Sequence, residues 1–496
     1  MIDTNFVHFP RRDGKAPALT LVLLGFVCLV FVAYAPAMWN RPYWDDNYLL
    51  VAAKRLMALG LTGFSSTPEL SGLYFYRPIE LSLVELNLWL VPTTYAPLLF
   101  FSLLMHIGKG VITGAIIRRI VPGNNWAPIV GALIYIAHPI AVSTTIQIDI
   151  VSANLASLCG AFSVLAVLHF ANLRGLWLWF RLIFISLIAL VGFFAKESFF
   201  VVGISLPALF AIKQYPFTLA RTGRYVSVLG LGVATAMALY LFVRSTHGFG
   251  LNAHADRYDL ALGINVIRNT ITLILGTLFY SDTHTFLTHR NWIDGVVAIA
   301  IFATPLAVAI LTLRHQSVVR LTLQQLNLAE FTIVVIAIFA GLFPEALTKA
   351  VSEHNTAMIL PFVVAITVSS FTAIYQCMEK IGLRKPPVEL LATFIVVVIT
   401  WGIQSVGTKT AAARDMSDRI AWASNQIKDL IRVSNAAHVC VNEGTRNIWW
   451  RYSIYALPPN DYIPLELFLL KYQYPEADIS WEDRSPGHLL GCDLWF

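Results

Sequence analysis

The sequence predicts an all-α polytopic membrane protein with about eleven transmembrane helices. Of its 496 residues, 57% are apolar and only 13% are charged. Apolar runs of about 18 to 22 residues recur along the chain, and each can cross a hydrocarbon core of roughly 30 Å. A barrel would need alternating strands of about ten residues, which these uniformly apolar runs do not supply. The net charge of +6 therefore belongs to loops, and we expect no nucleic-acid partner.

Basic residues orient the helices, because they concentrate in cytoplasmic loops. The first apolar run, 18–39, follows a basic N-terminal segment and lacks a small-residue cleavage site, so we interpret it as a retained helix with a cytoplasmic N-terminus. Loop 40–95 then faces outward. Further spans are expected at 96–117, 126–138, 151–171 and 176–195, from Lys196 to Lys213, and at 225–243, 292–313, 331–346, 357–377 and 388–406.

The apolar stretch 261–280 is expected to lie in the interface or to re-enter, because a full crossing would place Arg314 and Arg320 outside. After Val406 the composition becomes mixed and polar, which predicts a transmembrane catalytic module over 1–406 and a small soluble domain over 407–496. Cys440 and Cys492 both fall in the second region and are able to form one disulfide in an oxidising compartment.

The outer loop 40–95 carries an acid pair between elements of its own. Asp45 and Asp46 precede apolar residues whose helical spacing ends at Gly60, which predicts a short amphipathic helix. A second such helix is predicted over 79–91, too charged to span and suited to the interface. One aspartate at this place is explained equally well as a helix cap, but a second beside it indicates chemistry.

Several short motifs occur in an order that resembles a known family. They are Asp45-Asp46, Tyr76-Arg77-Pro78, His106, His138-Pro139 and Ala195-Lys196-Glu197-Ser198 ahead of Pro207. Together they resemble the GT-C fold membrane glycosyltransferases that use polyprenyl-phosphate sugars, and are most similar to the protein O-mannosyltransferases and their tetratricopeptide-bearing relatives. The tetratricopeptide repeats are absent from this sequence, and the segment after His138-Pro139 departs from the family pattern.

The resemblance implies a catalytic base and cationic groups for a phosphate. Asp45 is the favoured base, supported by Asp46, and two carboxylates this close are also able to coordinate a divalent cation. Arg77 suits a phosphate because its fork matches phosphate oxygens, and Lys196 is the second cation. A structural ion pair between Lys196 and Glu197 is the alternative explanation for that dipeptide.

Other polar residues are expected to line the substrate site. We assign Tyr76, His138, Glu197, Glu353 and His354 to substrate binding. A solvated interfacial tip explains the two histidines about equally well. By contrast, His106 lies deeper in a span and is expected to make an interhelical hydrogen bond, while Glu345 could complete a polar rim.

Two functions of different classes fit these features. The first is an inverting transfer of a sugar from a polyprenyl-phosphate donor to a hydroxyl of a glycan, glycolipid or protein acceptor. The second is a secondary transporter or flippase for a lipid-linked or anionic solute. No internal repeat is visible and the charges gather at one face, which favours the enzyme. We expect an integral protein of a bacterial inner membrane, with its active face and terminal domain in the periplasm.

Overall fold

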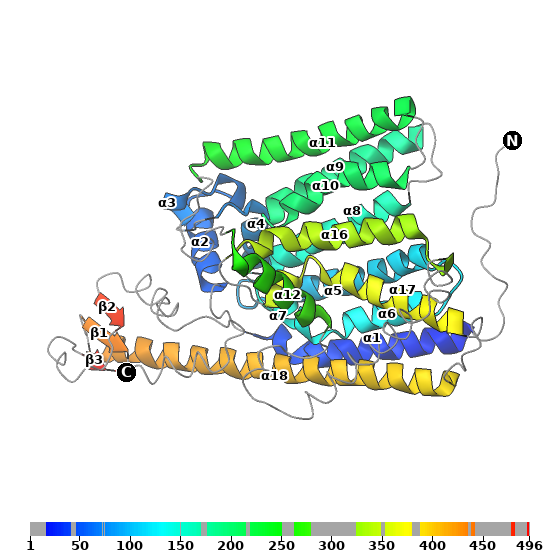
Figure 1. Cartoon of the computed structure of the whole chain (residues 1–496). Helices are drawn as coiled ribbons and strands as arrows, with labels where there is room; N and C mark the ends of the chain where they lie inside the picture. The colour runs from blue at the N-terminus through cyan, green and yellow to red at the C-terminus, as the bar shows by residue number, and fades with distance from the viewer. Residues whose placement is uncertain are drawn as a thin grey trace.

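The computed structural model of the chain is a bundle of long helices with several short helices gathered at one end (Figure 1). It describes residues 16–40, 46–71, 73, 75–148, 150–169, 176–214, 219–249, 262–278, 324–348, 353–378, 387–434, 438–441, 478–481 and 494–495. Within these ranges seven helices are long and apolar enough to cross a membrane, and one bent pair would make an eighth. The polytopic all-α fold class is therefore confirmed.

The long helices correspond closely to the predicted spans. They are α1 (Ala16–Met38), α5 (Ala96–Ile120), α8 (Val151–Leu168), α9 (Leu176–Ala195), α10 (Phe199–Lys213), α11 (Leu219–Thr246), α16 (Leu328–Ala346), α17 (Leu360–Met378) and α18 (Val388–Ser434). The predicted third span, 126–138, corresponds to α6 (Ala127–Ile136). After a break at His138-Pro139 the chain continues as η2 (Pro139–Ala141) and α7 (Val142–Ile146), which bend away from α6 by 47°. Pro139 cannot continue a helix ladder, which explains the break. The predicted span 292–313 lies outside the described residues.

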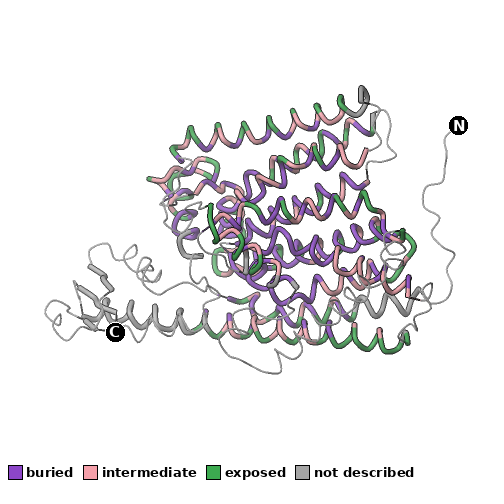
Figure 2. The backbone as a smooth tube through the Cα atoms, viewed as in Figure 1, coloured by how far each residue is buried: buried purple, intermediate pink, exposed green. Residues whose placement is uncertain are grey.

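The interior of the bundle lies along α5 and α8, whereas α11 and α18 lie at its margins. Figure 2 shows buried residues concentrated in the central helices. In the apolar segment of α8, 72% of the residues are buried, whereas in that of α18 only 17% are. Glycines allow α5 and α6 to pack closely: a Cβ at Gly110 would lie 2.4 Å from Ile136 Cγ1, and one at Gly114 would lie 2.6 Å from the Pro128 carbonyl oxygen. Small residues commonly permit such contacts between membrane helices.

Loop 40–95 folds into helices, as predicted from its apolar spacing. It contains α2 (Asp46–Ala58), η1 (Gly63–Ser65), α3 (Pro68–Ser71) and α4 (Pro78–Leu90), which gather at the left end of the bundle in Figure 1. The helix α2 ends before Gly60, whose φ of 67° suits a glycine. Glu85 fixes the loop to α4, because its Oε2 accepts a hydrogen bond from the Gly63 backbone N–H at 2.9 Å. The loop is thus a packed part of the protein.

The helix α12 (Ile264–Leu278) corresponds to the stretch expected in the interface. Its 15 residues span only about 22 Å, less than a hydrocarbon core. Asn269 is buried and donates hydrogen bonds to the carbonyls of Ala346 and Thr348, while Ile264 and Ile267 are exposed. One face of α12 therefore packs on the end of α16, and the other is available to lipid.

The helix α18 continues well beyond Val406, to Ser434, before a small sheet. Strands β1 (His438–Val441), β2 (Asp478–Trp481) and β3 (Leu494–Trp495) pair in parallel in the order β2-β1-β3. The sheet lies beyond the left end of α18 in Figure 1. The division into 1–406 and 407–496 stays a prediction. The pairing of Cys440 and Cys492 also stays a prediction, because Cys492 and the side chain of Cys440 lie outside the described part.

An ion pair and a backbone hydrogen bond link three helices at the other end of the bundle. The Lys213 ammonium group at the end of α10 pairs with the Glu330 carboxylate in the first turn of α16, and both side chains are nearly buried. Nearby, the Asn327 N–H donates to the Ile120 carbonyl at the end of α5 at 2.8 Å. These contacts join the start of α16 to α10 and α5, at the end opposite the short helices.

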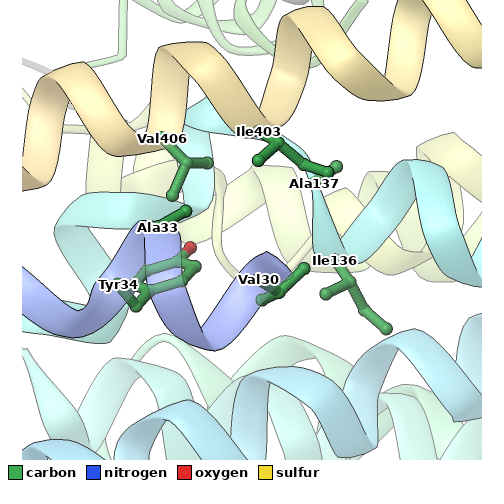
Figure 3. Close-up of a pocket in the computed structure, with 7 residues that line it drawn as sticks. All are labelled: Val30, Ala33, Tyr34, Ile136, Ala137, Ile403 and Val406. Carbon is green, nitrogen blue, oxygen red and sulfur yellow. The ribbon is translucent and has the colours of Figure 1, made fainter. Parts of the chain in front are cut away.

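A narrow apolar pocket lies between α1, the end of α6 and α18 (Figure 3). Its lining comprises Val30, Ala33, Tyr34, Ile136, Ala137, Ile403 and Val406. The lining contains no charged side chain, and its only polar group is the Tyr34 hydroxyl. This pocket is therefore unsuited to an anionic substrate, and the charged residues of the protein gather elsewhere.

Candidate functional site

The link between α9 and α10 places two charged residues at the end of the bundle that carries the short helices. The turn is tight: the Lys196 N–H donates to the Gly192 carbonyl at 3.1 Å, and the Phe199 N–H donates to the Lys196 carbonyl at 3.1 Å. Gly192 is needed here, because a Cβ would lie 2.7 Å from atoms of the Phe199 ring. This packing fixes the backbone from which Lys196 and Glu197 project.

Arg77 meets Glu197 across 120 residues of sequence. Its Nε donates to Glu197 Oε2 at 3.1 Å, and its Nη1 lies 3.7 Å from Glu80 Oε2 one turn into α4. The guanidinium also lies over the Phe75 ring, 4.0 Å from the centroid. A stacked, doubly paired arginine is well fixed in orientation. Arg77 therefore belongs to a charged cluster with Glu197 and Glu80, and its assignment to a donor phosphate stays a prediction.

A second arginine, which sequence analysis did not assign to the site, joins this cluster from α11. Arg244 Nη1 lies 3.7 Å from Glu197 Oε1 and donates to the Tyr240 hydroxyl at 3.2 Å. That hydroxyl in turn donates to the Tyr76 carbonyl at 3.2 Å. The available signal was the position of Arg244 in the last turn of an apolar span, on the same predicted face as Arg77.

Lys196 and Glu345 complete the cluster. Lys196 is buried and interacts electrostatically with Glu345, Glu80 and Glu197, yet it forms no ion pair with any side chain that the structure describes. Glu345, in the last turn of α16, accepts a hydrogen bond from the Asn355 amide. Among the described side chains, Glu197 pairs with Arg77 and Arg244. These contacts differ from the alternative expectation of a simple Lys196–Glu197 ion pair.

The pKa values of Glu80, Glu197 and Lys196 reflect competition between burial and the charge of neighbouring groups. Burial raises the pKa of Glu80 to about 7, against the opposing effects of Arg77, Ser152 and Lys196. Burial also acts to raise the pKa of Glu197, but Arg77 and Arg244 together bring it below its usual value. Burial lowers the pKa of Lys196, although the nearby carboxylates oppose this. The cluster therefore holds two arginines, one lysine and one partly exposed carboxylate, Glu197, whose pKa is lowered from its usual value.

Two further residues predicted for the site, Tyr76 and His138, are buried and hydrogen-bonded to backbone groups. Tyr76 is fully buried, donates its hydroxyl to the Phe64 carbonyl at 3.0 Å, and stacks on His247, so it anchors the loop; burial raises its pKa to about 12. His138 is also buried: its Nε2 donates to the Thr277 carbonyl at 3.1 Å and its Nδ1 accepts from the Ile140 N–H at 3.3 Å. His138 therefore holds η2 against α12 in this structure.

The side chains of four predicted site residues lie outside the described part of the structure. Asp45 lies outside the described residues, and Asp46 begins α2 with a side chain outside them. Glu353 and His354 begin η4 (Glu353–Thr356), and their side chains also lie outside the described part. Their assignments stay predictions. Among the described residues there is no group of three His, Cys, Asp or Glu side chains that could hold a metal ion.

His106 matches the expectation of an interhelical hydrogen bond. It is buried in α5, and its Nε2 lies 2.9 Å from the Ile136 carbonyl oxygen of α6. Its ring also lies between Tyr34 and Tyr135. His106 therefore joins α1, α5 and α6 inside the bundle.

The chain has the GT-C fold of membrane glycosyltransferases. Two solved structures carry this result, both of ArnT from Cupriavidus metallidurans. The apo form matches with a TM-score of 0.52 and 11% identity over 93% of this chain and 89% of ArnT. The form bound to undecaprenyl phosphate matches with a TM-score of 0.52 and 13% identity over 93% and 90%.

At these identities the likeness establishes the fold alone. It does not single out the protein O-mannosyltransferase branch that the sequence motifs suggested. No protein-family model and no curated protein matches the sequence. The function must therefore be argued from the charged cluster itself.

Proposed function

We propose that this protein is an inverting glycosyltransferase that moves a sugar from a polyprenyl-phosphate donor to an acceptor hydroxyl at the outer face of the membrane. The observation that carries the proposal is the convergence of Arg77, Arg244 and Lys196 at one end of the bundle. Three cations around a partly exposed position suit a phosphate that reaches the site from the lipid phase. ArnT, which shares the fold, has been solved with undecaprenyl phosphate bound.

The reaction requires a base on the side of the sugar opposite the phosphate. We assign this role to Asp45, with Asp46 as its support, because the loop that bears them is packed through α2 and α4 onto the same end of the bundle. The acceptor hydroxyl would lose its proton to the carboxylate as its oxygen attacks the anomeric carbon. The bond to the phosphate oxygen breaks, and the arginines stabilise the charge on the departing phosphate.

Three classes of acceptor are compatible with the proposed site. A glycan, a glycolipid or a protein hydroxyl would each be accessible at a membrane surface, and a divalent cation held by the acid pair is compatible with the same chemistry. The proposed orientation places the N-terminus in the cytoplasm of a bacterial cell, and the active face and terminal sheet in the periplasm. The basic residues Arg118 and Arg119 at the end of α5 support this orientation.

The test is transfer of a radiolabelled sugar from polyprenyl-phosphate sugars by purified protein. Asp45→Asn combined with Asp46→Asn should abolish transfer, and Arg77→Ala should lower kcat/KM about 100-fold or more, the usual effect of removing one group that stabilises a developing charge. Lys54→Ala, which removes an exposed cation from α2, is the matched control and should leave transfer unchanged.

Two results would refute the proposal. Turnover that survives the double aspartate substitution would remove the catalytic assignment. Movement of an intact lipid-linked sugar across vesicles, without transfer to any acceptor, would instead establish the transporter.

A further inference from the structure

We propose that Glu197 is a displaceable carboxylate that lies between Arg77 and Arg244 where a phosphate would bind, and that it favours release of the polyprenyl-phosphate product over the donor. This inference rests on the proposed function and assigns a distinct role to one residue of the same site. It concerns the order of events after transfer, when the spent lipid phosphate must leave before another donor binds.

The geometry of Glu197 is that of an anion held between two arginine forks. Oε2 accepts from Arg77 Nε at 3.1 Å, and Oε1 lies 3.7 Å from Arg244 Nη1. A phosphate presents its oxygens to arginines in the same manner. Arg77 caps the start of α4 and Arg244 lies in the last turn of α11, so a ligand bound by both must lie where the carboxylate now lies.

Glu197 is the carboxylate of the cluster that a ligand can displace. Its side chain is 31% exposed, whereas that of Glu80 is fully buried, and Glu345 is buried and bonded to Asn355. Only side-chain torsions need to change, because the backbone of the turn is held by hydrogen bonds such as that from the Phe200 N–H to the Glu197 carbonyl at 3.0 Å.

The cations keep their positions when the carboxylate leaves. Arg77 retains its stacking on Phe75 and its neighbour Glu80, and Arg244 retains its hydrogen bond to Tyr240. The site is therefore preorganised for an incoming phosphate. Displaced Glu197 remains close by, since it is tethered to the α9–α10 turn.

The charge balance of the reaction explains why such a carboxylate is useful. The donor is a phosphodiester with one negative charge. Transfer breaks the bond between the anomeric carbon and the phosphate oxygen, joins that carbon to the acceptor oxygen, and leaves a phosphomonoester with a charge of about −1.5 to −2. Three cations would hold this product more tightly than the donor. A carboxylate that returns to the arginines opposes the more highly charged ligand more strongly, and so lowers product inhibition.

The experiment compares the affinity of purified protein for undecaprenyl phosphate and for its methyl ester, a diester that carries one charge. The wild type should show a small preference for the monoester. In Glu197→Gln the monoester should bind about tenfold tighter, as expected for removal of a nearby like charge, with a smaller change for the diester. Glu69→Gln, an exposed carboxylate of α3 in the same loop, should leave both affinities unchanged.

A second variant guards against a merely structural effect. Glu197→Asp keeps the charge and should stay within about threefold of the wild-type preference, whereas general damage to the site would weaken both ligands in both variants. An unchanged or reduced monoester preference in Glu197→Gln would overturn this inference while leaving the glycosyltransferase proposal intact. Failure of the wild type to bind either ligand, or binding without transfer, would overturn the proposed function and this inference with it.

Discussion

The titration of Glu80 gives a stability prediction that can be worked out from the structure. In the folded protein this carboxyl is buried beneath Arg77, and burial raises its pKa from 4.5 to about 7. A raised pKa means that the folded state binds the proton more tightly than the unfolded chain. The stabilising contribution of the protonated carboxyl is therefore fully present below pH 4.5, and is lost as the pH rises through about 7.

The size of the effect follows from the same two values. Each pH unit between them corresponds to about 1.4 kcal/mol, so the wild type should lose about 3 kcal/mol of folding free energy between pH 4.5 and pH 7.5 through this group. Glu80→Gln replaces the acid with a neutral group of the same shape and lacks this loss. The variant should therefore gain stability relative to the wild type as the pH rises, by several degrees in apparent Tm.

The assay is thermal unfolding of both proteins in detergent at matched pH values from 4.5 to 8. The informative quantity is the difference in apparent Tm between variant and wild type, because other titrating groups cancel in that difference. Glu69→Gln serves as the exposed control and should follow the wild type at every pH. A difference for Glu80→Gln that is independent of pH would refute the burial argument, and one that falls with rising pH would reverse its sign.

Further predictions concern packing and charge at the two ends of the bundle. Gly63→Ala should destabilise the protein by about 1–3 kcal/mol, because its Cβ would lie 2.5 Å from the Pro78 carbonyl oxygen. Gly123→Ala, with open space around it, is the control in the same unfolding assay. Equal unfolding midpoints for the two variants would contradict the close packing at Gly63. Lys213→Met alone should cost about 3–5 kcal/mol by leaving buried Glu330 unpaired, and adding Glu330→Leu should recover most of that loss. An additive double variant would contradict the ion pair. Arg244→Ala should weaken binding of undecaprenyl phosphate at least tenfold while Arg224→Ala, at the opposite end of α11, should not; equal loss in both would remove Arg244 from the phosphate site.

The fold was largely predictable because a membrane helix can be recognised from the length and composition of its own segment. A run such as 96–117 must satisfy its own backbone hydrogen bonds in lipid, so its length and composition suffice to identify α5. The packed loop helices α2 and α4 were also predictable, since their apolar periodicity is a local property. The end of the third span at His138-Pro139 was predicted as well, but no local pattern predicted that η2 and α7 would follow it at an angle of 47°.

The charged cluster was predictable only in part. The sequence indicated Arg77, because its guanidinium fork suits a phosphate, and Lys196, because a lysine at the end of an apolar span is costly unless paired or functional. It could not show that Glu197 pairs with Arg77 across 120 residues. Nor could it assign Arg244 to the site. For the histidines it left the alternatives open, and the structure shows that His138 holds backbone groups of two segments.

The sequence by itself determined the membrane class, the positions of the long helices that the structure describes and the helices of loop 40–95, because each depends on neighbours along the chain. The tertiary structure decided which charges meet. Those contacts depend on how helices far apart in sequence pack, and that packing is set by close approaches such as Gly110 against Ile136 and by the tight α9–α10 turn at Gly192. Side-chain packing at these positions, which no local pattern records, brings Arg77, Arg244 and Glu197 together.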